Sequence, residues 1–203
     1  HVAAAHDRPY EREFLVPLAS HRIGCDVHQG LLRWREFPIE VNDILQRART
    51  LPSGWRVCAD IDLLLHTALH AANAAFQVPM RTLLDVHLLT RSSDLDWAEV
   101  IVQARRWRAG RCLWLTLDIA RRWFQSPIPE AALSALSPPP HLARRLSTIF
   151  SDEGQWACSE AANTRLMRAV SRALLRERKR DASAYLWQTL QREVSLALGR
   201  RRA

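Results

Sequence analysis

The sequence predicts a mainly α-helical fold that begins with a short β-hairpin, so the chain as a whole is of the α+β class. First, two short apolar runs near the N-terminus flank a turn-like segment. Second, apolar residues recur at helical spacing from Ile39 onward, interrupted by prolines and glycines. Third, 48% of the 203 residues are hydrophobic, which is enough for a buried core. We therefore expect strands in residues 1–37 and a multi-helix domain in residues 38–203.

The predicted hairpin occupies residues 14–18 and 23–28, and residues 19–22 (ASHR) form its turn. Pro17 falls in the first of these two strands. Because proline has no backbone N–H to donate to a neighbouring strand, we expect Pro17 at an edge or a bulge of the sheet.

Helical periodicity and its interruptions place the remaining elements. Ser93 and Asp94 are candidate caps of one helix, with Asp96 as an acidic residue in its first turn. Pro79 suits the first turn of the helix that it opens, because the N–H that it lacks would have no partner there. We expect helices near residues 40–50, 60–76, 80–91, 95–108, 110–124, 129–136, 141–150, 158–178 and 182–198. Four tryptophans should pack in the core or at its edge: Trp97, Trp107, Trp114 and Trp123.

The charge and the cysteines exclude several classes of protein. Arginine supplies almost all of the net charge of +8, since Lys179 is the only lysine. This excess is typical of GC-rich genomes, so it does not favour nucleic acid as the partner, although arginine forks bind phosphates. No CxxC pair is present, so we expect reduced thiols instead of a zinc ribbon or a disulfide framework. The cysteines are Cys25, Cys58, Cys112 and Cys158.

The sequence contains neither a membrane span nor a secretory signal. No apolar run approaches the roughly 20 residues that a spanning helix needs, and the first residues lack the basic-then-apolar signal pattern. We therefore expect a cytoplasmic protein. Because the chain does not begin with methionine, we also expect that residue 1 is not the gene's first codon or that the chain was cut.

Basic side chains recur at helical spacing in the C-terminal third of the chain, where they form one face of an amphipathic helix. These residues are Arg165, Arg168, Arg172, Arg176, Arg178, Lys179 and Arg180. Such a face is either solvated or docks an acidic or phosphate-rich partner. The second alternative describes a catalytically inactive helical interaction module.

The densest set of ionisable residues among apolar ones lies in residues 60–90. In a helix, Asp62, His66 and His70 fall within a polar stripe about 80° wide, together with Asn73 and Gln77. One interpretation is a solvated edge on which Asp62 pairs with His66. A second is a divalent metal held by the i, i+4 histidines, although no HExxH glutamate is present. A third is that these residues line a pocket or orient a neighbour.

The next helix carries Arg81 and Asp85, four residues apart with the base first, which is the less favourable order for an ion pair. Leucines and a valine surround Asp85, so its carboxylate should need a partner from another helix, and His66 or His70 is the best guess. The spacing from Arg81 to His87 also matches the loose pattern of the helical HEPN ribonucleases, which gives a third candidate function.

Several of these segments, taken in order, resemble the C-terminal part of the uncharacterised nucleotidyltransferases, a branch of the DNA polymerase β-like superfamily. The similarity runs from about residue 14 to residue 133. The segments are residues 24–28 (GCDVH), 62–72 (DLLLHTALHAA), 81–86 (RTLLDV), 95–97 (LDW) and 110–117.

This resemblance implies a catalytic sheet with a Gly-Ser step, an Asp-x-Asp on one strand and a third carboxylate on another. These acids would hold two Mg²⁺ or Mn²⁺ ions that align an NTP with its acceptor, a small molecule, peptide or protein. Asp26 matches the third carboxylate, so it is the expected metal ligand and catalytic residue. Residues 1–37 would then be the last strands of that sheet.

The first two acids of the family are expected upstream of His1, so this chain alone would lack a complete two-metal site. Asp60 and Asp62 superficially read as the missing Asp-x-Asp. We reject this interpretation because residues i and i+2 of a helix diverge by about 200°. The leading hypothesis is nucleotidyl transfer, provided that the Gly-Ser and Asp-x-Asp segment is present.

Overall fold

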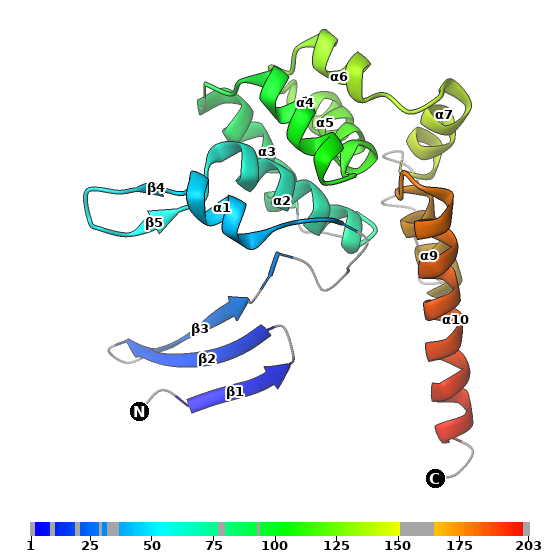
Figure 1. Ribbon diagram of the computed structural model, residues 1–203, viewed down its shortest axis with the longest axis horizontal. Coiled ribbons are helices and arrows are strands. Elements are labelled where there is room, and N and C mark those ends of the chain that lie inside the picture. Colours follow the sequence, from blue (N-terminus) through cyan, green and yellow to red (C-terminus); the bar gives the residue numbers. More distant parts are fainter. Residues whose placement is uncertain are drawn as a thin grey trace.

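The structure is a computed structural model that describes residues 3–8, 11–18, 21–28, 30–31, 37–76, 80–92, 94–150 and 165–200. A small antiparallel sheet precedes a body of packed helices, which confirms the predicted α+β, mainly α class (Figure 1). In these residues, no helix has both the length and the apolar character that crossing a membrane would require.

The N-terminal sheet contains three strands in the order β1-β2-β3: Ala3–Arg8, Glu11–Leu18 and His21–His28. β2 and β3 are the predicted hairpin, whereas β1 was not predicted. Its sequence AAAHDR has no β-branched or aromatic residue, so β1 depends on pairing with β2 and not on its own propensity. Pro17 lies opposite Arg22, past Leu15, which is the last partner of β1 in the described register.

The segment after the sheet differs from the predicted helix at 40–50. Helix α1 covers only Val41–Arg47, and a small hairpin follows, made of β4 (Arg49–Thr50) and β5 (Arg56–Val57). The turn between the two strands contains Gly54 at φ 83°, a left-handed conformation that glycine adopts without strain. The turn at residues 52–54 allows residues 49–50 to pair with residues 56–57, and the helix therefore ends at Arg47.

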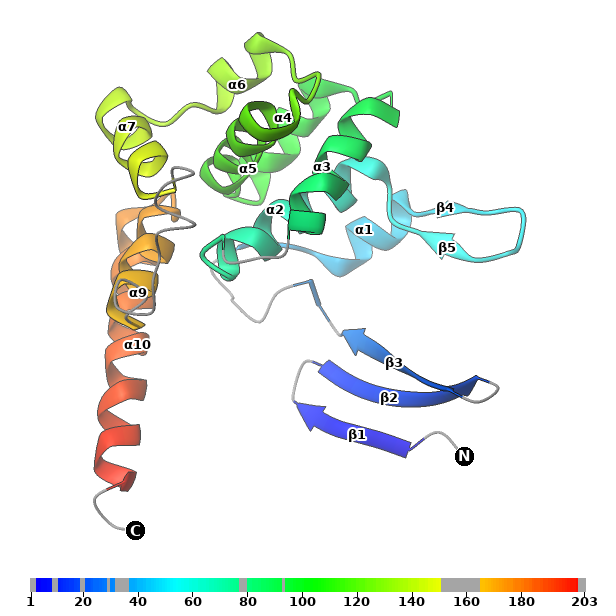
Figure 2. The same cartoon turned by 180° about the vertical axis from the view of Figure 1, so that it is seen from behind.

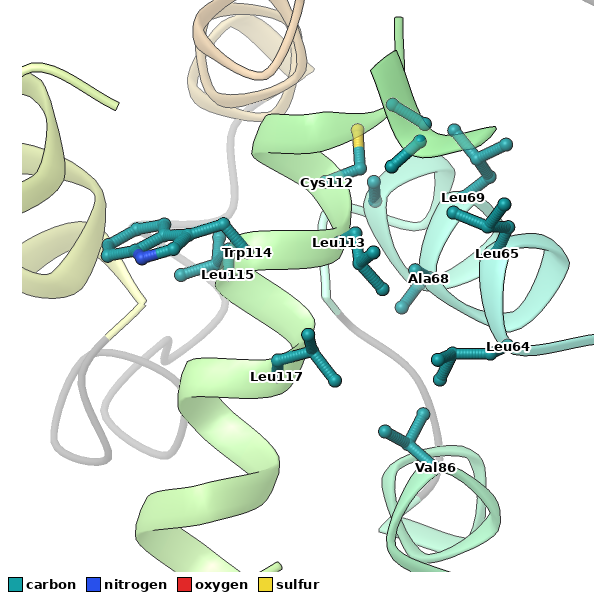
Figure 3. Close-up of a cluster of buried hydrophobic side chains, with 14 of the residues drawn as sticks. Leu64, Leu65, Ala68, Leu69, Val86, Cys112, Leu113, Trp114, Leu115 and Leu117 are labelled. Atoms are coloured by element: carbon teal, nitrogen blue, oxygen red, sulfur yellow. The ribbon is translucent and has the colours of Figure 1, made fainter. Parts of the chain in front are cut away.

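The helical body consists of α2 (Asp60–Asn73), α3 (Met80–Ser92), α4 (Trp97–Arg106), α5 (Gly110–Phe124), α6 (Glu130–Leu136) and α7 (Pro140–Ile149). At its centre is α5, whose middle is buried on nearly all sides because its residues are apolar around the whole helix. Leu113 and Leu117 of α5 face Leu65 and Ala68 of α2, with Val86 of α3 beside them (Figure 3).

Two expectations about these helices have clear outcomes. Trp107 and Trp114 are buried, and Trp97 and Trp123 pack against the same core, as predicted.

The structure corrects the predicted cap of α4. Asp96 is the N-cap and accepts hydrogen bonds from the backbone N–H groups of residues 98 and 99 (2.9 and 3.2 Å), so it is not a first-turn residue. Ser93 and Pro79 lie outside the described residues.

The C-terminal part contains α9 (Arg165–Leu174) and α10 (Lys179–Arg200). The turn between them lies at residues 175–178, a few residues before the break at 179–181 between the two predicted helices. In both views α10 extends beyond the N-terminal start of α9, away from the helical body (Figures 1 and 2). The expected basic face is only partly solvated. Arg178, Lys179 and Arg180 are exposed, but Arg176 is buried with its guanidinium 4.0 Å from the centre of the Tyr185 ring.

The turn between α9 and α10 docks on the first turn of α5 through reciprocal capping. The N–H of Gly110 donates to Glu177 Oε1 (2.7 Å), and Arg111 donates to the carbonyls of Leu174 (3.2 Å) and Arg176 (2.5 Å). These bonds satisfy backbone groups that lack partners at the helix ends. An ion pair of 3.5 Å from Arg108 to the start of α10 supports the same junction.

Candidate active site

Asp26, the predicted metal ligand, is exposed on β3 and stands directly opposite Glu13 of β2. Opposed residues of antiparallel strands point to the same face of the sheet. The Glu13 carboxylate leans along β3, since its Oε1 atom lies 3.7 Å from the position that a Cβ on Gly24 would take. Within the described part of the chain, neither carboxylate forms an ion pair. Two like charges therefore face each other without a counter-charge.

A divalent metal requires more donors than this pair provides. Carboxylate oxygens are ligands that Mg²⁺ and Mn²⁺ prefer. Among the described residues, however, no group of three or more His, Cys, Asp or Glu side chains is arranged to hold a metal ion. Asp26 and Glu13 thus fit only part of a metal site.

Histidines stand at the end of β3 and on the polar stripe of α2. His28 follows Asp26 by two residues, so both side chains are on one face of β3. Burial, then the neighbouring His70 and His28, lower the pKa of His66 below its ordinary value. The rings of His66 and His70 have their centres 6.3 Å apart. We call His66 and His70 the histidine pair of α2.

The structure corrects the expected partner of Asp62. Its side chain is fully buried and receives two hydrogen bonds from Arg47 of α1, Nε to Oδ2 at 3.0 Å and Nη2 to Oδ1 at 2.7 Å. The hydrogen bonding of Arg47 to the Asp62 carboxylate raises the pKa of Arg47, against the opposing effect of burial. Asp62 therefore pairs with Arg47 and not with His66. The reason is that α1 approaches α2 on this side and covers the first part of the predicted polar stripe.

Two further contacts extend this ion pair to α4. With its amide oxygen turned toward both donors, Gln103 accepts hydrogen bonds from Trp107 Nε1 (2.6 Å) and from Arg47 Nη2 (3.3 Å). At the surface, Arg106 of α4 pairs with Asp43 of α1 at 2.7 Å. Polar contacts thus fix α1, which carries only one buried apolar residue, against both α2 and α4.

The acid and base of α3 do not join the site. Arg81 and Asp85 are exposed and make no ion pair with any described residue, which corrects the expectation that Asp85 needs His66 or His70. His87 points elsewhere, with Nδ1 3.0 Å from Ser126 Oγ, whose hydroxyl donates to the Ala120 carbonyl. His87 must then donate from Nδ1. No described contact joins Arg81 to His87, so the geometry adds no support to the ribonuclease alternative.

Cys112, which is buried in the helical core, is not a reactive thiol. Cys25, Cys58 and Cys112 are free, and Cys158 lies outside the described residues. Burial raises the pKa of Cys112 to about 12, so this thiol is protonated at neutral pH and is not a nucleophile.

Sequence reasoning missed Glu13, Arg47 and Gln103. Glu13 directly precedes the predicted strand 14–18 and alternates with Leu15. Extending the pairing of the two predicted strands by one residue would have placed Glu13 opposite Asp26. No local signal identified Arg47 or Gln103, because each acquires its role from a helix distant in sequence.

Comparison with known protein families found a match over the N-terminal part of the chain. A family model described as uncharacterised nucleotidyltransferase matches residues 1–125, a span that includes Asp26, His66, His70 and α5. No significant match was found among curated proteins or among solved structures. The matched segment is 125 of 203 residues, and it confirms the resemblance seen in the sequence. The chain therefore belongs to the uncharacterised nucleotidyltransferase family.

Proposed function

We propose that this protein transfers a nucleotidyl group from an NTP to a small molecule, peptide or protein, with Asp26 as one of the metal-binding carboxylates. The family match over residues 1–125 carries this proposal, because it includes the strand of Asp26 and the helices beside it. The exposed position of Asp26, opposite a second carboxylate that leans along the same strand, supports it.

The cofactor of this reaction is Mg²⁺ or Mn²⁺. Asp26 and Glu13 are oxygen donors of the type these ions prefer, but two carboxylates do not complete a site for two ions. The proposal therefore requires a Gly-Ser step and an Asp-x-Asp in addition to the described residues.

The helical body has a supporting part in this proposal. His66 and His70 lie one turn apart on α2 with their ring centres 6.3 Å apart, and Asp62 orients α2 through the two hydrogen bonds that it accepts from Arg47. Because the Asp62 carboxylate is buried in this pair, it acts as a positioning residue and does not touch the substrate.

The test is nucleotidyl transfer from labelled NTPs, with Mg²⁺ or Mn²⁺ and candidate protein, peptide and small-molecule acceptors. Asp26→Asn removes a ligand charge and should lower the rate by at least about 100-fold. Asp94→Asn, an exposed acid between α3 and α4, is the matched control and should transfer normally. Equal rates in wild type and Asp26→Asn would show that Asp26 has no role in the reaction.

The alternative is an inactive module that docks an acidic or phosphate-rich partner. Its supporting observation is the net charge of +8, with Arg178, Lys179 and Arg180 exposed where α10 begins. A chain that neither binds NTPs nor transfers nucleotides, and whose acidic partner is released by changing these three residues, would favour this function.

A further inference from the structure

Helix α7 presents a basic face to the solvent. Its apolar side chains are buried in the core of the helical body or pack against it, which fixes the orientation of the helix. These apolar residues are Leu142, Ala143, Leu146 and Phe150. On the other side, four exposed polar side chains recur at spacings of three and four residues, so they share an arc of about 100°. These residues are His141, Arg144, Arg145 and Thr148.

An open hollow of about 370 Å³ lies over this face of α7. Its volume is near the lower end of the range for sites that take small molecules. The described residues that line it are the four of the basic face and Ile149. Both views place α7 at the end of the helical body away from the N-terminal sheet (Figures 1 and 2). Since α7 also lies outside the matched residues 1–125, the hollow is separate from the proposed catalytic carboxylate.

Two positive charges in this hollow have no described counter-charge. The side chains of Arg144 and Arg145 form no ion pair or hydrogen bond with any described residue, and no described acid lines the hollow. Other arginines of the helical body do pair with acids, as Arg106, Arg121 and Arg122 show. Two adjacent guanidinium forks without a carboxylate favour an anion with several acceptor oxygens, and phosphate is the best match.

Thr148 adds a hydrogen-bond acceptor to the same hollow. Its hydroxyl donates to the backbone carbonyl of Arg144 (2.9 Å), so its only proton is engaged and its oxygen is left to accept. Thr148 follows Arg144 by four residues and Arg145 by three, which makes it their neighbour on the helix surface. A molecule that fills this acceptor must carry a hydroxyl or an amine in addition to its phosphate.

We propose that the α7 hollow binds a small phosphate ester with free hydroxyl groups, such as a sugar or polyol phosphate. The phosphate accepts hydrogen bonds from Arg144, Arg145 and the imidazole of His141. A hydroxyl of the same molecule donates to Thr148, and its carbon skeleton packs against Ile149. This binding site goes beyond the proposed nucleotidyl transfer and does not depend on it.

The experiment measures the binding of glycerol phosphate, inorganic phosphate and glycerol to the full chain by calorimetry. Wild type should bind glycerol phosphate most tightly, inorganic phosphate more weakly and glycerol not at all. Arg144→Gln and Arg145→Gln should each weaken the binding of both phosphates by about tenfold, the equivalent of one charge-assisted hydrogen bond. Arg91→Gln removes the same charge from an exposed position on α3, so it is the matched control and should bind like wild type.

Thr148→Val tests the hydroxyl part of the proposal. Valine keeps the shape of the side chain but removes the acceptor oxygen. The variant should bind glycerol phosphate about fivefold more weakly and inorganic phosphate unchanged. Equal affinity of wild type for both phosphates, with no effect of Thr148→Val, would overturn the proposal and leave a site for free phosphate only.

Three other outcomes would also overturn the proposal. The first is a wild-type chain that does not bind glycerol phosphate. The second is equal weakening in Arg91→Gln and Arg144→Gln, which would indicate nonspecific attraction to the net charge of +8. The third is binding of a single-stranded oligonucleotide through Arg144 and Arg145 without binding of glycerol phosphate, which would make the partner a nucleic acid.

The variants separate loss of the site from loss of the fold. The side chains of Arg144, Arg145 and Thr148 are exposed, so thermal unfolding of each variant should match that of wild type. Nucleotidyl transfer enters none of these measurements. Its failure would leave the α7 site standing, and a failure of glycerol phosphate binding would leave the proposed transfer standing.

Discussion

At the scale of single residues, the geometry of α2 depends most on the ion pair of Arg47 with Asp62. The carboxylate is fully buried, whereas the guanidinium is 27% exposed. Removing one member of a buried pair leaves the other charge without compensation. We expect Arg47→Met to lower the free energy of unfolding by about 3 kcal/mol, measured by urea denaturation.

The matched control is Arg106→Met, which breaks the more exposed pair with Asp43 on the same helix α1. A surface pair contributes at most about 1 kcal/mol, so this variant should be nearly as stable as wild type. In addition, the double change Arg47→Met/Asp62→Leu should recover most of the stability, because no buried charge is left. Similar losses in Arg47→Met and Arg106→Met would contradict the assignment.

His66 should make the stability depend on pH in a defined direction. Burial and the two neighbouring histidines lower its pKa in the folded state below the ordinary value of 6.5. The unfolded chain therefore binds more protons between these two pKa values. Stability is fully present above 6.5 and decreases as the pH falls toward the folded pKa.

His66→Gln should flatten this part of the curve of unfolding free energy between about pH 7.5 and about pH 5.5. His141→Gln replaces an exposed histidine on α7 and serves as the control. If wild type and His66→Gln lose stability equally on acidification, the lowered pKa is not the cause.

Among the helices, α5 has an unusual N-terminal cap. Its first N–H, on Gly110, donates a hydrogen bond to the side chain of Glu177, which comes from the turn before α10. An ideal Cβ on Gly110 would lie 2.7 Å from Glu177 Oε1, the atom that accepts the hydrogen bond from Gly110. The carboxylate can swing aside, but it then loses the cap. We expect Gly110→Ala and Glu177→Ala each to cost about 1 kcal/mol in thermal or urea unfolding.

A double-mutant cycle tests this explanation. In the Glu177→Ala background no carboxylate remains to be displaced, so Gly110→Ala should cost nothing more. Additive losses would show that the alanine disturbs something other than the cap, such as its contact with Leu136 at 3.7 Å.

The helices differ in how well their ends follow from local sequence. α5 has the predicted bounds 110–124, because a glycine begins it and apolar residues recur at helical spacing up to Phe124. α1 ends at Arg47 because residues 49–57 pair as a hairpin, and strand pairing outweighs the weak helical preference of a short segment. Local pattern predicted the periodic helices well, including the short α6, but it missed β1 and the hairpin of β4 and β5.

For the whole molecule, Arg111 connects the helical body to the C-terminal pair of helices. It donates to the carbonyls of Leu174, Arg176 and Glu177, at the end of α9 and in the following turn. Arg111→Gln should raise hydrogen exchange in α9 and in the first half of α10 by about tenfold, because these charge-assisted bonds are lost. Exchange in α2 should not change.

Arg122→Gln, near the opposite end of α5, is the control and should leave α9 and α10 protected. Uniformly faster exchange throughout the Arg111→Gln chain would indicate global destabilisation instead of local release of these helices.

The candidate site was predicted only in part for the same physical reason as the fold. Asp26 was found because a family motif of adjacent residues surrounds it, and His66 and His70 because a helix places residues i and i+4 together. The partner of Asp62 was missed, since Arg47 comes from a different helix, 15 residues away. The division of the chain into the last strands of a catalytic sheet, residues 1–37, and a helical domain, residues 38–203, remains a prediction.

The sequence alone determined the fold class, the long helices and the family, and it predicted a metal-binding role for Asp26. These depend on local periodicity and on motifs of neighbouring residues, which a single chain displays directly. Only the tertiary structure decided that Glu13 faces Asp26 and that Arg47 pairs with the buried Asp62. Such contacts follow from how strands pair in register and how helices pack, and residues distant in sequence acquire their partners only when that packing forms.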